Sequence, residues 1–236
     1  MTREAIILAG GLGTRLQKIV SDVPKPMAQI INKPFLLYLF QYLKHFGIEK
    51  IILAVGHKNE IIRDYFKDQF ESIKINYAIE ENLLGTGGGL KNALLNCEEE
   101  EVLVLNGDSF FDIDLNAFWD FHQNHNSNFS LALREVEDSS RFGTIQINSN
   151  QNIISFKEKN GQTEKGIINA GIYLVNRSLF LKECENLNSF SLEKDFLEIK
   201  LKDLNINGKI FQSYFIDIGV PEDFQKAQHD FKGFAY

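Results

Sequence analysis

The chain has 236 residues, of which 44% are hydrophobic, and its 25 lysines and arginines against 32 aspartates and glutamates give a formal charge of -7. This length and composition allow a full core without a second domain, so we expect one domain over residues 1–236. The negative charge excludes a general nucleic-acid binder and a protein held on anionic membranes, because both need an excess of cations. Any phosphate ligand must therefore be bound by locally placed cations.

The cysteines and the apolar stretches bear on the compartment. Cys97 and Cys184 form neither a CxxC pair nor a metal-binding spacing. The first apolar run is far shorter than the apolar region of a signal peptide, and no stretch approaches the roughly 20 residues of a membrane span. We therefore expect a cytoplasmic protein with reduced cysteines and no membrane partner.

Short apolar runs alternate with helical patterns in the first half of the chain. The runs cover residues 5–9, 51–55, 73–79 and 102–105, and all but the third are continuous, as in strands buried on both faces. Between them, apolar residues recur at helical spacing from Phe35 to Phe46 and from Ile61 to Phe66. This alternation predicts an α/β fold with right-handed crossovers.

The second half has a different pattern. Alternating strands are expected near residues 130–135, 144–147, 153–157 and 167–175, and an amphipathic helix near 221–231, where Pro221 suits a first turn. These elements predict a mixed sheet with a substrate-facing flap.

A glycine-rich segment, GGLGTRL at residues 10–16, directly follows the first strand. Open α/β sheets bind ligands at this edge, and glycines let backbone N–H groups approach phosphate closely. Leu16 stands where a Rossmann fingerprint needs its third glycine, and no Gly-Lys-Ser/Thr follows as in a P-loop. The segment is therefore either an unusual phosphate loop or a plain tight turn.

Two cations favour the phosphate loop. Arg15 lies within the segment, and Lys25 lies between Pro24 and Pro26, which should hold its backbone extended and stiff. Arg15 can bind phosphate oxygens as a fork, while Lys25 supplies a compact charge. The alternative is a solvated loop with two ordinary cations.

Seven segments together resemble the signature of the sugar-1-phosphate nucleotidyltransferases. They are LAGGLGTRL at residues 8–16, PKPM at 24–27, LGTGGG at 84–89, NGD at 106–108, FKEK at 156–159, NAGIY at 169–173 and IDIGVPED at 216–223. The resemblance implies a Rossmann-like nucleotidyltransferase fold, in which helices flank a central mixed, mainly parallel sheet. It covers the catalytic domain alone, without the C-terminal β-helix of larger relatives.

The resemblance also implies a reaction. An oxygen of a sugar 1-phosphate attacks the α-phosphorus of a nucleoside triphosphate in line, and pyrophosphate leaves. The nucleophile is already an anion, so no general base is required. Cations placed in advance, including the expected cofactor Mg²⁺, lower the barrier that arises from repulsion between anions.

Roles for individual residues follow from the same resemblance. Arg15 and Lys25 are the expected catalytic residues, and Asp108 and Asp217 the expected ligands of Mg²⁺, which takes few protein oxygens. The expected nucleotide-binding residues are Leu8, Ala9, Gly10, Gly11, Gly13, Thr14, Arg15, Lys25, Glu80, Gly85, Thr86 and Asp108. The expected sugar-phosphate-binding residues are Gly143, Glu158, Lys159 and Asn169. By sequence alone, Asp108 could equally be a turn residue.

Glu80 favours GTP as the nucleotide. A carboxylate accepts hydrogen bonds and donates none, so it matches the adjacent N1–H and N2–H₂ donors of guanine, whereas glutamine suits thymine or uracil better. Glu81 as the reader, or Glu80 as a surface charge, stays open. Within the family, the chain is most similar to bacterial members acting on D-glycero-α-D-manno-heptose 1-phosphate in surface polysaccharide synthesis, and the expected sugar rests on that resemblance alone.

Other functions stay open beside this one. The same chemistry could serve mannose 1-phosphate, or a uridylyltransferase acting on glucose or N-acetylmuramate phosphate. A non-catalytic nucleotide-sugar sensor is disfavoured. Binding without turnover would tolerate the loss of at least one of four charged residues, and all four are present: Arg15, Lys25, Asp108 and Asp217.

A homodimer is compatible with the aromatic content of 12%. We interpret His122 and His125 as a solvated helix end rather than a metal site, and residues 98–101 as a solvated loop.

Overall fold

A computed structural model describes residues 1–11, 20, 22–157, 163–234 and 236. Its main sheet has ten strands in the described part, eight of which follow the order β11-β10-β12-β7-β1-β4-β6-β5. Parallel pairing joins β7 (Glu101–Asn106), β1 (Glu4–Leu8), β4 (Lys50–Val55) and β6 (Ile73–Ile79). These are the four strands expected from the apolar runs, and their boundaries agree within one residue.

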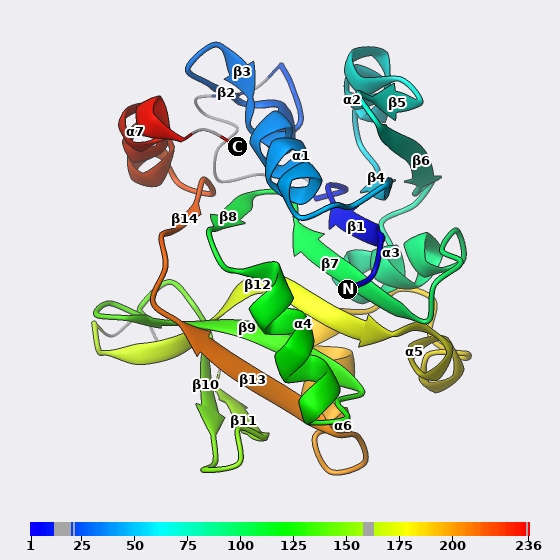
Figure 1. Cartoon of the computed structure of the whole chain (residues 1–236), viewed down its shortest axis with the longest axis vertical. Helices are drawn as coiled ribbons and strands as arrows, with labels where there is room; N and C mark the ends of the chain where they lie inside the picture. The colour runs from blue at the N-terminus through cyan, green and yellow to red at the C-terminus, as the bar shows by residue number, and fades with distance from the viewer. Residues whose placement is uncertain (12–19, 21, 158–162, 235) are drawn as a thin grey trace.

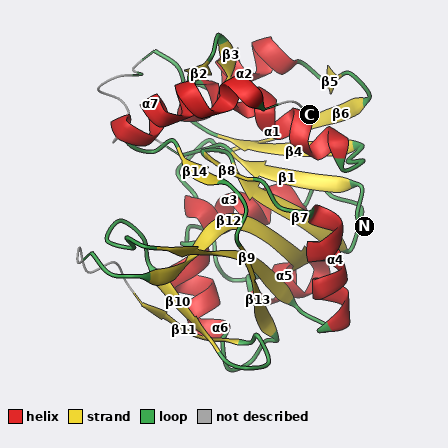
Figure 2. Ribbon diagram, turned by 60° about the vertical axis from the view of Figure 1, so that its left-hand side comes forward, coloured by secondary structure: helices red, strands yellow, loops and turns green. Residues whose placement is uncertain are grey.

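Helices cover both faces of this sheet (Figures 1 and 2). Ala5 and Ile7 of β1 belong to a core shared with α1 (Phe35–His45) and α2 (Asn59–Phe66), whereas Ile6 belongs to a second core. The first core also takes in α4 (Leu115–Asn124) and α7 (Pro221–Asp230), and the second takes in α3 (Gly85–Leu94), α5 (Arg177–Glu183) and the π-helix η2 (Leu192–Leu197). Burial on both faces explains why the runs are continuously apolar.

The second half of the chain extends the sheet with mostly antiparallel strands. They are β9 (Phe129–Val136), β10 (Thr144–Ile147), β11 (Ile153–Lys157), β12 (Gly166–Asn176) and β13 (Ile206–Phe211). Strand β12 joins the two halves, because it pairs antiparallel with β7 on one edge and with β9 on the other. The predicted mixed, mainly parallel sheet flanked by helices is confirmed.

Small elements complete the described chain. They are η1 (Lys25–Met27), β2 (Gln29–Ile30), β3 (Lys33–Pro34), β5 (Gln69–Phe70), β8 (Ser109–Phe111), α6 (Glu198–Lys200), β14 (Phe215–Asp217) and η3 (Phe231–Gly233). Among them, β8 and β14 pair antiparallel, with Ser109 opposite Asp217. This ribbon carries the two expected metal ligands to one place.

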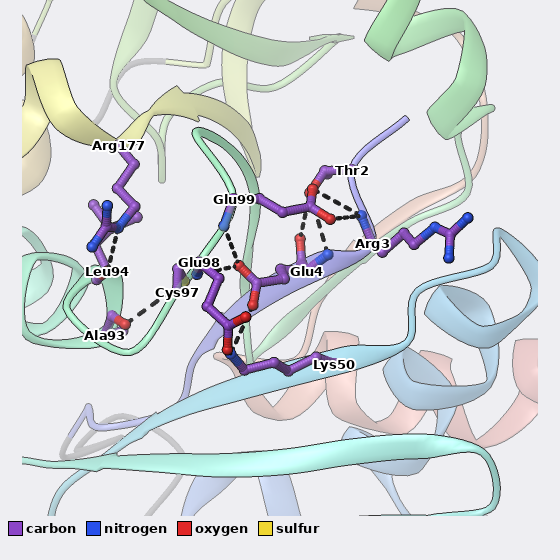
Figure 3. Close-up of polar contacts among 10 residues, drawn as sticks. All are labelled: Thr2, Arg3, Glu4, Lys50, Ala93, Leu94, Cys97, Glu98, Glu99 and Arg177. Atoms are coloured by element: carbon purple, nitrogen blue, oxygen red, sulfur yellow. Dashed lines mark hydrogen bonds and ion pairs between the residues drawn. The ribbon is translucent and has the colours of Figure 1, made fainter.

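A polar network lies at the amino ends of the strands (Figure 3). The Glu4 carboxylate accepts hydrogen bonds from the backbone N–H groups of Glu98 and Glu99, at 2.7 and 2.8 Å. It also pairs with the Lys50 ammonium at 2.7 Å, and the Glu4 side chain is only 6% exposed. The network ties β1, β4 and the loop before β7 together.

Two interpretations from the sequence were wrong. His122 is not solvated but 1% exposed, and its ring nitrogens bond Ser130 Oγ at 2.8 Å and Glu101 Oε2 at 3.0 Å. Glu101 is not in a solvated loop, because it begins β7 and also accepts a hydrogen bond from Asn176. Helix α4 packs its His122 face against the sheet, where a buried imidazole needs polar partners.

Within the described residues, the helices are all too short or too polar to cross a bilayer. Cys97 and Cys184 are both buried and free. The single-domain organisation and the cytoplasmic location stay predictions.

Candidate active site

Two cavities lie along the carboxyl ends of the central strands and share Asn106 and Asp108 in their walls. The first has a volume of about 270 Å³ and the second about 390 Å³. We call them the nucleotide-side cavity and the sugar-side cavity. Because both include the carboxyl end of β7 and the turn after it, ligands in the two cavities would meet at Asp108.

Most of the predicted nucleotide-binding residues line the nucleotide-side cavity. They are Leu8, Ala9, Gly10, Gly11, Lys25, Glu80, Gly85, Thr86 and Asp108. The three others, Gly13, Thr14 and Arg15, lie outside the described residues. The cavity thus gathers residues from the ends of β1, β6 and β7, the first turn of α3 and the short helix η1.

Glu80 lies in the wall of this cavity rather than on an outer surface. Its Oε2 accepts a hydrogen bond from the backbone N–H of Leu84 at 3.2 Å. A Cβ atom built on Gly10 or Gly89 would lie 2.8 or 2.6 Å from its Oε1, so a side chain at either position would displace this carboxylate. Burial raises the pKa of Glu80, and the Leu84 N–H opposes part of that rise. Glu81, the alternative reader, is exposed and does not line the cavity.

Lys25 lies between the two expected metal ligands. Its ammonium is 2.6 Å from Asp108 Oδ2 and 3.3 Å from Asp217 Oδ1, and the side chain is 9% exposed. The Gly219 N–H donates a hydrogen bond to Asp217 Oδ1 at 2.7 Å. Burial and the negative charge of Asp108 raise the pKa of Asp217, while Lys25 and the Gly219 N–H oppose that rise.

The backbone at Lys25 differs from the extended form that the sequence predicted. Lys25–Met27 form one 3-10 turn, closed by hydrogen bonds from Met27 N–H to the Pro24 carbonyl and from Ala28 N–H to the Lys25 carbonyl. Proline fits here because the missing N–H of Pro26 falls in the first turn, where a helix leaves N–H groups without a partner. The segment is stiff, as expected, but helical.

The carboxylate pair fits a divalent cation. Asp108 and Asp217 already hold one positive group, the Lys25 ammonium, between their oxygens. Among the described residues there is no cluster of three or more metal-binding side chains. Two carboxylates nevertheless suffice for Mg²⁺, which keeps several positions for water and phosphate.

The sugar-side cavity contains the predicted Gly143 and Asn169, whereas Glu158 and Lys159 lie outside the described residues. Its wall also includes Arg141, Lys157 and Glu193, which were not among the predicted site residues. Arg141 and Lys157 stand beside residues that had been singled out, so proximity in sequence could have found them. Glu193 carried no comparable signal, because it belongs to a short helix far from every recognised motif.

The sequence matches the nucleotidyl transferase family over residues 4–232. The chain belongs to this family. Two relatives are both described as D-glycero-alpha-D-manno-heptose 1-phosphate guanylyltransferase. The one from Aneurinibacillus thermoaerophilus is 46% identical, over 96% of this chain and 97% of that one. The one from Campylobacter jejuni is 47% identical, over 94% and 96%.

A solved structure of a family relative supports the fold. HddC from Yersinia pseudotuberculosis superposes with a TM-score of 0.86 at 37% identity, over 98% of this chain and all of that one. A second HddC structure is a complex with GMP-PN and superposes with a TM-score of 0.85. The predicted family and the predicted fold class are therefore both confirmed.

Proposed function

We propose that this protein transfers GMP from GTP to D-glycero-α-D-manno-heptose 1-phosphate, giving GDP-heptose and pyrophosphate. The observation that carries the proposal is the identity of 46–47% over nearly the whole chain to two relatives named for this reaction. The GMP-PN complex of HddC supports the guanine nucleotide.

Glu80 is the proposed reader of the base. Its carboxylate accepts from the N1–H and N2–H₂ donors of guanine, and the Leu84 N–H holds its position. The backbone at Gly85, which begins α3 with a φ of 72°, forms the adjoining wall. A positive φ there is easily adopted only by glycine.

Lys25 and Arg15 are the proposed cations for the triphosphate. Lys25 donates hydrogen bonds to phosphate oxygens and reduces the repulsion between the two anionic substrates. Asp108 and Asp217 would hold Mg²⁺, which as a Lewis acid supplies charge stabilisation at the α-phosphate. The pairing of β8 with β14 fixes these two carboxylates before substrates arrive, so little reorganisation is needed.

The sugar phosphate binds in the sugar-side cavity in this proposal. Gly143 and Asn169 line this cavity. By resemblance to the family, Glu158 is the proposed partner of the sugar hydroxyls and Lys159 of the 1-phosphate. Asp108 lines both cavities, which supports this arrangement, because substrates bound in the two cavities would have the attacking oxygen and the α-phosphorus near one carboxylate.

Pyrophosphate release with Mg²⁺ tests the proposal. GTP, UTP, dTTP, CTP and ATP are each paired with heptose, mannose and glucose 1-phosphates. Release confined to GTP with heptose 1-phosphate is the expected result. Release with another pair would keep the proposed reaction and change its substrates. No pyrophosphate release with any pair would favour a non-catalytic sensor.

Asp108→Asn tests the metal role in the same assay. We expect a loss of turnover of at least about 100-fold, because the neutral amide binds Mg²⁺ poorly, with the melting temperature little changed. Chelation of Mg²⁺ by EDTA should abolish release by the wild-type protein. Near-normal turnover of the variant with Mg²⁺ would remove Asp108 from the proposed metal site.

A further inference from the structure

The Asn169 amide in the sugar-side cavity has already used its hydrogen-bond donors. Its Nδ2 donates to the Tyr173 hydroxyl at 2.8 Å and to Glu193 Oε1 at 2.6 Å, and its Oδ1 accepts from the Gly171 N–H at 3.1 Å. The amide cannot be turned over, because a carboxylate and a backbone N–H fix which atom is nitrogen and which is oxygen. An amide nitrogen has two N–H groups, so Asn169 has no donor left for a sugar.

The backbone around Asn169 keeps the amide in this position. Strand β12 shifts register against β9 between Asn169 and Tyr173, and Gly171 within the shift has a φ of 79°. Tyr173 is 2% exposed, and its hydroxyl is also bonded by the side chain of Asn106, which lines both cavities. The amide thus belongs to a fixed, buried polar chain whose exposed end is Glu193.

The segment that leads to Glu193 is hydrogen-bonded to residues 84–87 at the start of α3. The Phe190 N–H donates to the Leu84 carbonyl at 2.9 Å, and the Gly87 N–H donates to the Phe190 carbonyl at 3.0 Å. The Leu192 N–H donates to Thr86 Oγ1 at 2.9 Å. These bonds hold the start of η2 against the start of α3, so Glu193 enters the sugar-side cavity from a rigid support.

Glu193 therefore has one oxygen held and one oxygen available. Oε1 accepts from Asn169, while Oε2 has no hydrogen-bond partner among the described residues. A carboxylate oxygen accepts two hydrogen bonds and donates none, which suits hydroxyl donors and does not suit a phosphate. The side chain lines the cavity and is exposed to it.

We propose that Glu193 is a specificity-determining residue that accepts hydrogen bonds from hydroxyl groups of the sugar 1-phosphate, and that Asn169 is a positioning residue acting through it. The inference rests on the proposed function for the identity of the sugar. It changes the role of Asn169 from a direct sugar ligand to the group that orients the Glu193 carboxylate.

The variant Glu193→Gln tests the proposal in the full chain. Glutamine keeps the shape and can still accept from Asn169, but it presents an amide nitrogen to the hydroxyl groups. We expect KM for heptose 1-phosphate to rise about tenfold, with KM for GTP and the melting temperature unchanged, because a charge-assisted hydrogen bond is lost. An unchanged KM for the sugar phosphate would overturn the proposal.

Asn169→Ala separates positioning from direct binding. If Asn169 acts through Glu193, each single variant raises KM for the sugar phosphate, and the double variant is little worse than Glu193→Gln alone. If KM for the sugar phosphate rises in the double variant by the product of the two single increases, Asn169 binds the sugar independently. Glu185→Gln, a change at an exposed glutamate outside both cavities, is the matched control.

Calorimetric titration with heptose, mannose and glucose 1-phosphates distinguishes this inference from the proposed function. Tight binding of a sugar other than heptose by the wild-type protein, weakened by Glu193→Gln, would keep the inference and change the function. Equal binding of any one sugar phosphate by both proteins would overturn the inference alone. If the wild-type protein binds none of the three sugar phosphates, both the inference and the proposed function are overturned.

Discussion

Glu80 shows how backbone space controls a single functional side chain. Its carboxylate lies where side chains on Gly10 and Gly89 would collide with it, and the Leu84 N–H fixes one oxygen. Burial in this slot raises the pKa of Glu80 above its ordinary value of 4.5. The neutral form of Glu80 therefore becomes populated at a higher pH than for a free glutamate, and that form cannot accept from both guanine donors.

Glu80→Gln should weaken the preference for GTP over UTP by about tenfold, because one of the guanine donors loses its acceptor. The wild-type KM for GTP should also rise as pH falls toward the raised pKa of Glu80, and this rise should be missing in the variant. Steady-state kinetics with both nucleotides across pH measures the two effects. An unchanged base preference would move the reading of the base to another residue.

At the scale of elements, the glycines of α3 serve packing as well as ligand approach. A Cβ atom on Gly87 would lie 2.2 Å from the Phe190 ring, and one on Gly88 would lie 2.6 Å from the Asn188 carbonyl oxygen. The start of α3 and the segment before η2 can therefore meet only because these positions lack side chains. This contact supports both cavities, since Thr86 lines one and Glu193 the other.

Gly87→Ala should lower the free energy of unfolding by about 1–3 kcal/mol, because the added methyl group overpacks the contact with Phe190. Urea unfolding followed by circular dichroism measures the change. Gly233→Ala is the matched control, since a Cβ there meets nothing within 4 Å. A cost for Gly87→Ala no larger than that of the control would mean that the Phe190 ring moves aside freely.

At the scale of the whole molecule, the carboxyl and amino ends of the central strands differ in function. The carboxyl ends of the strands carry both cavities, while the network of Glu4, Lys50 and the N–H groups of Glu98 and Glu99 joins the amino ends (Figure 3). Burial by itself would raise the pKa of Glu4, but the two N–H groups and Lys50 outweigh it and leave the pKa below 4.5. Glu4 therefore stabilises the fold in its ionised form.

Glu4→Gln should lower the free energy of unfolding by about 2 kcal/mol at pH 7, because Lys50 loses a buried partner. A carboxylate with a lowered pKa in the folded state stabilises above its unfolded pKa and loses that effect as pH falls through the folded pKa. The difference between wild type and variant should shrink below about pH 4.5. Urea unfolding at several pH values measures it, and a difference independent of pH would contradict the assignment.

The sequence by itself determined the family, the four strands β1, β4, β6 and β7, and most positions that line the nucleotide-side cavity. Continuous apolar runs are typical of strands buried on both faces, and the family motifs are recognisable because each is a short, ordered stretch of sequence. The role of Asp108 came from the family resemblance, because by sequence alone it could equally be a turn residue.

Only the tertiary structure decided which distant groups meet. Lys25 lies between Asp108 and Asp217 because β8 pairs with β14, and Asn169 meets Glu193 because η2 docks on α3. His122 is buried for the same kind of reason, since α4 turns that face to the sheet. Such contacts join residues far apart in the chain, and local sequence patterns carry no information on distances across the fold.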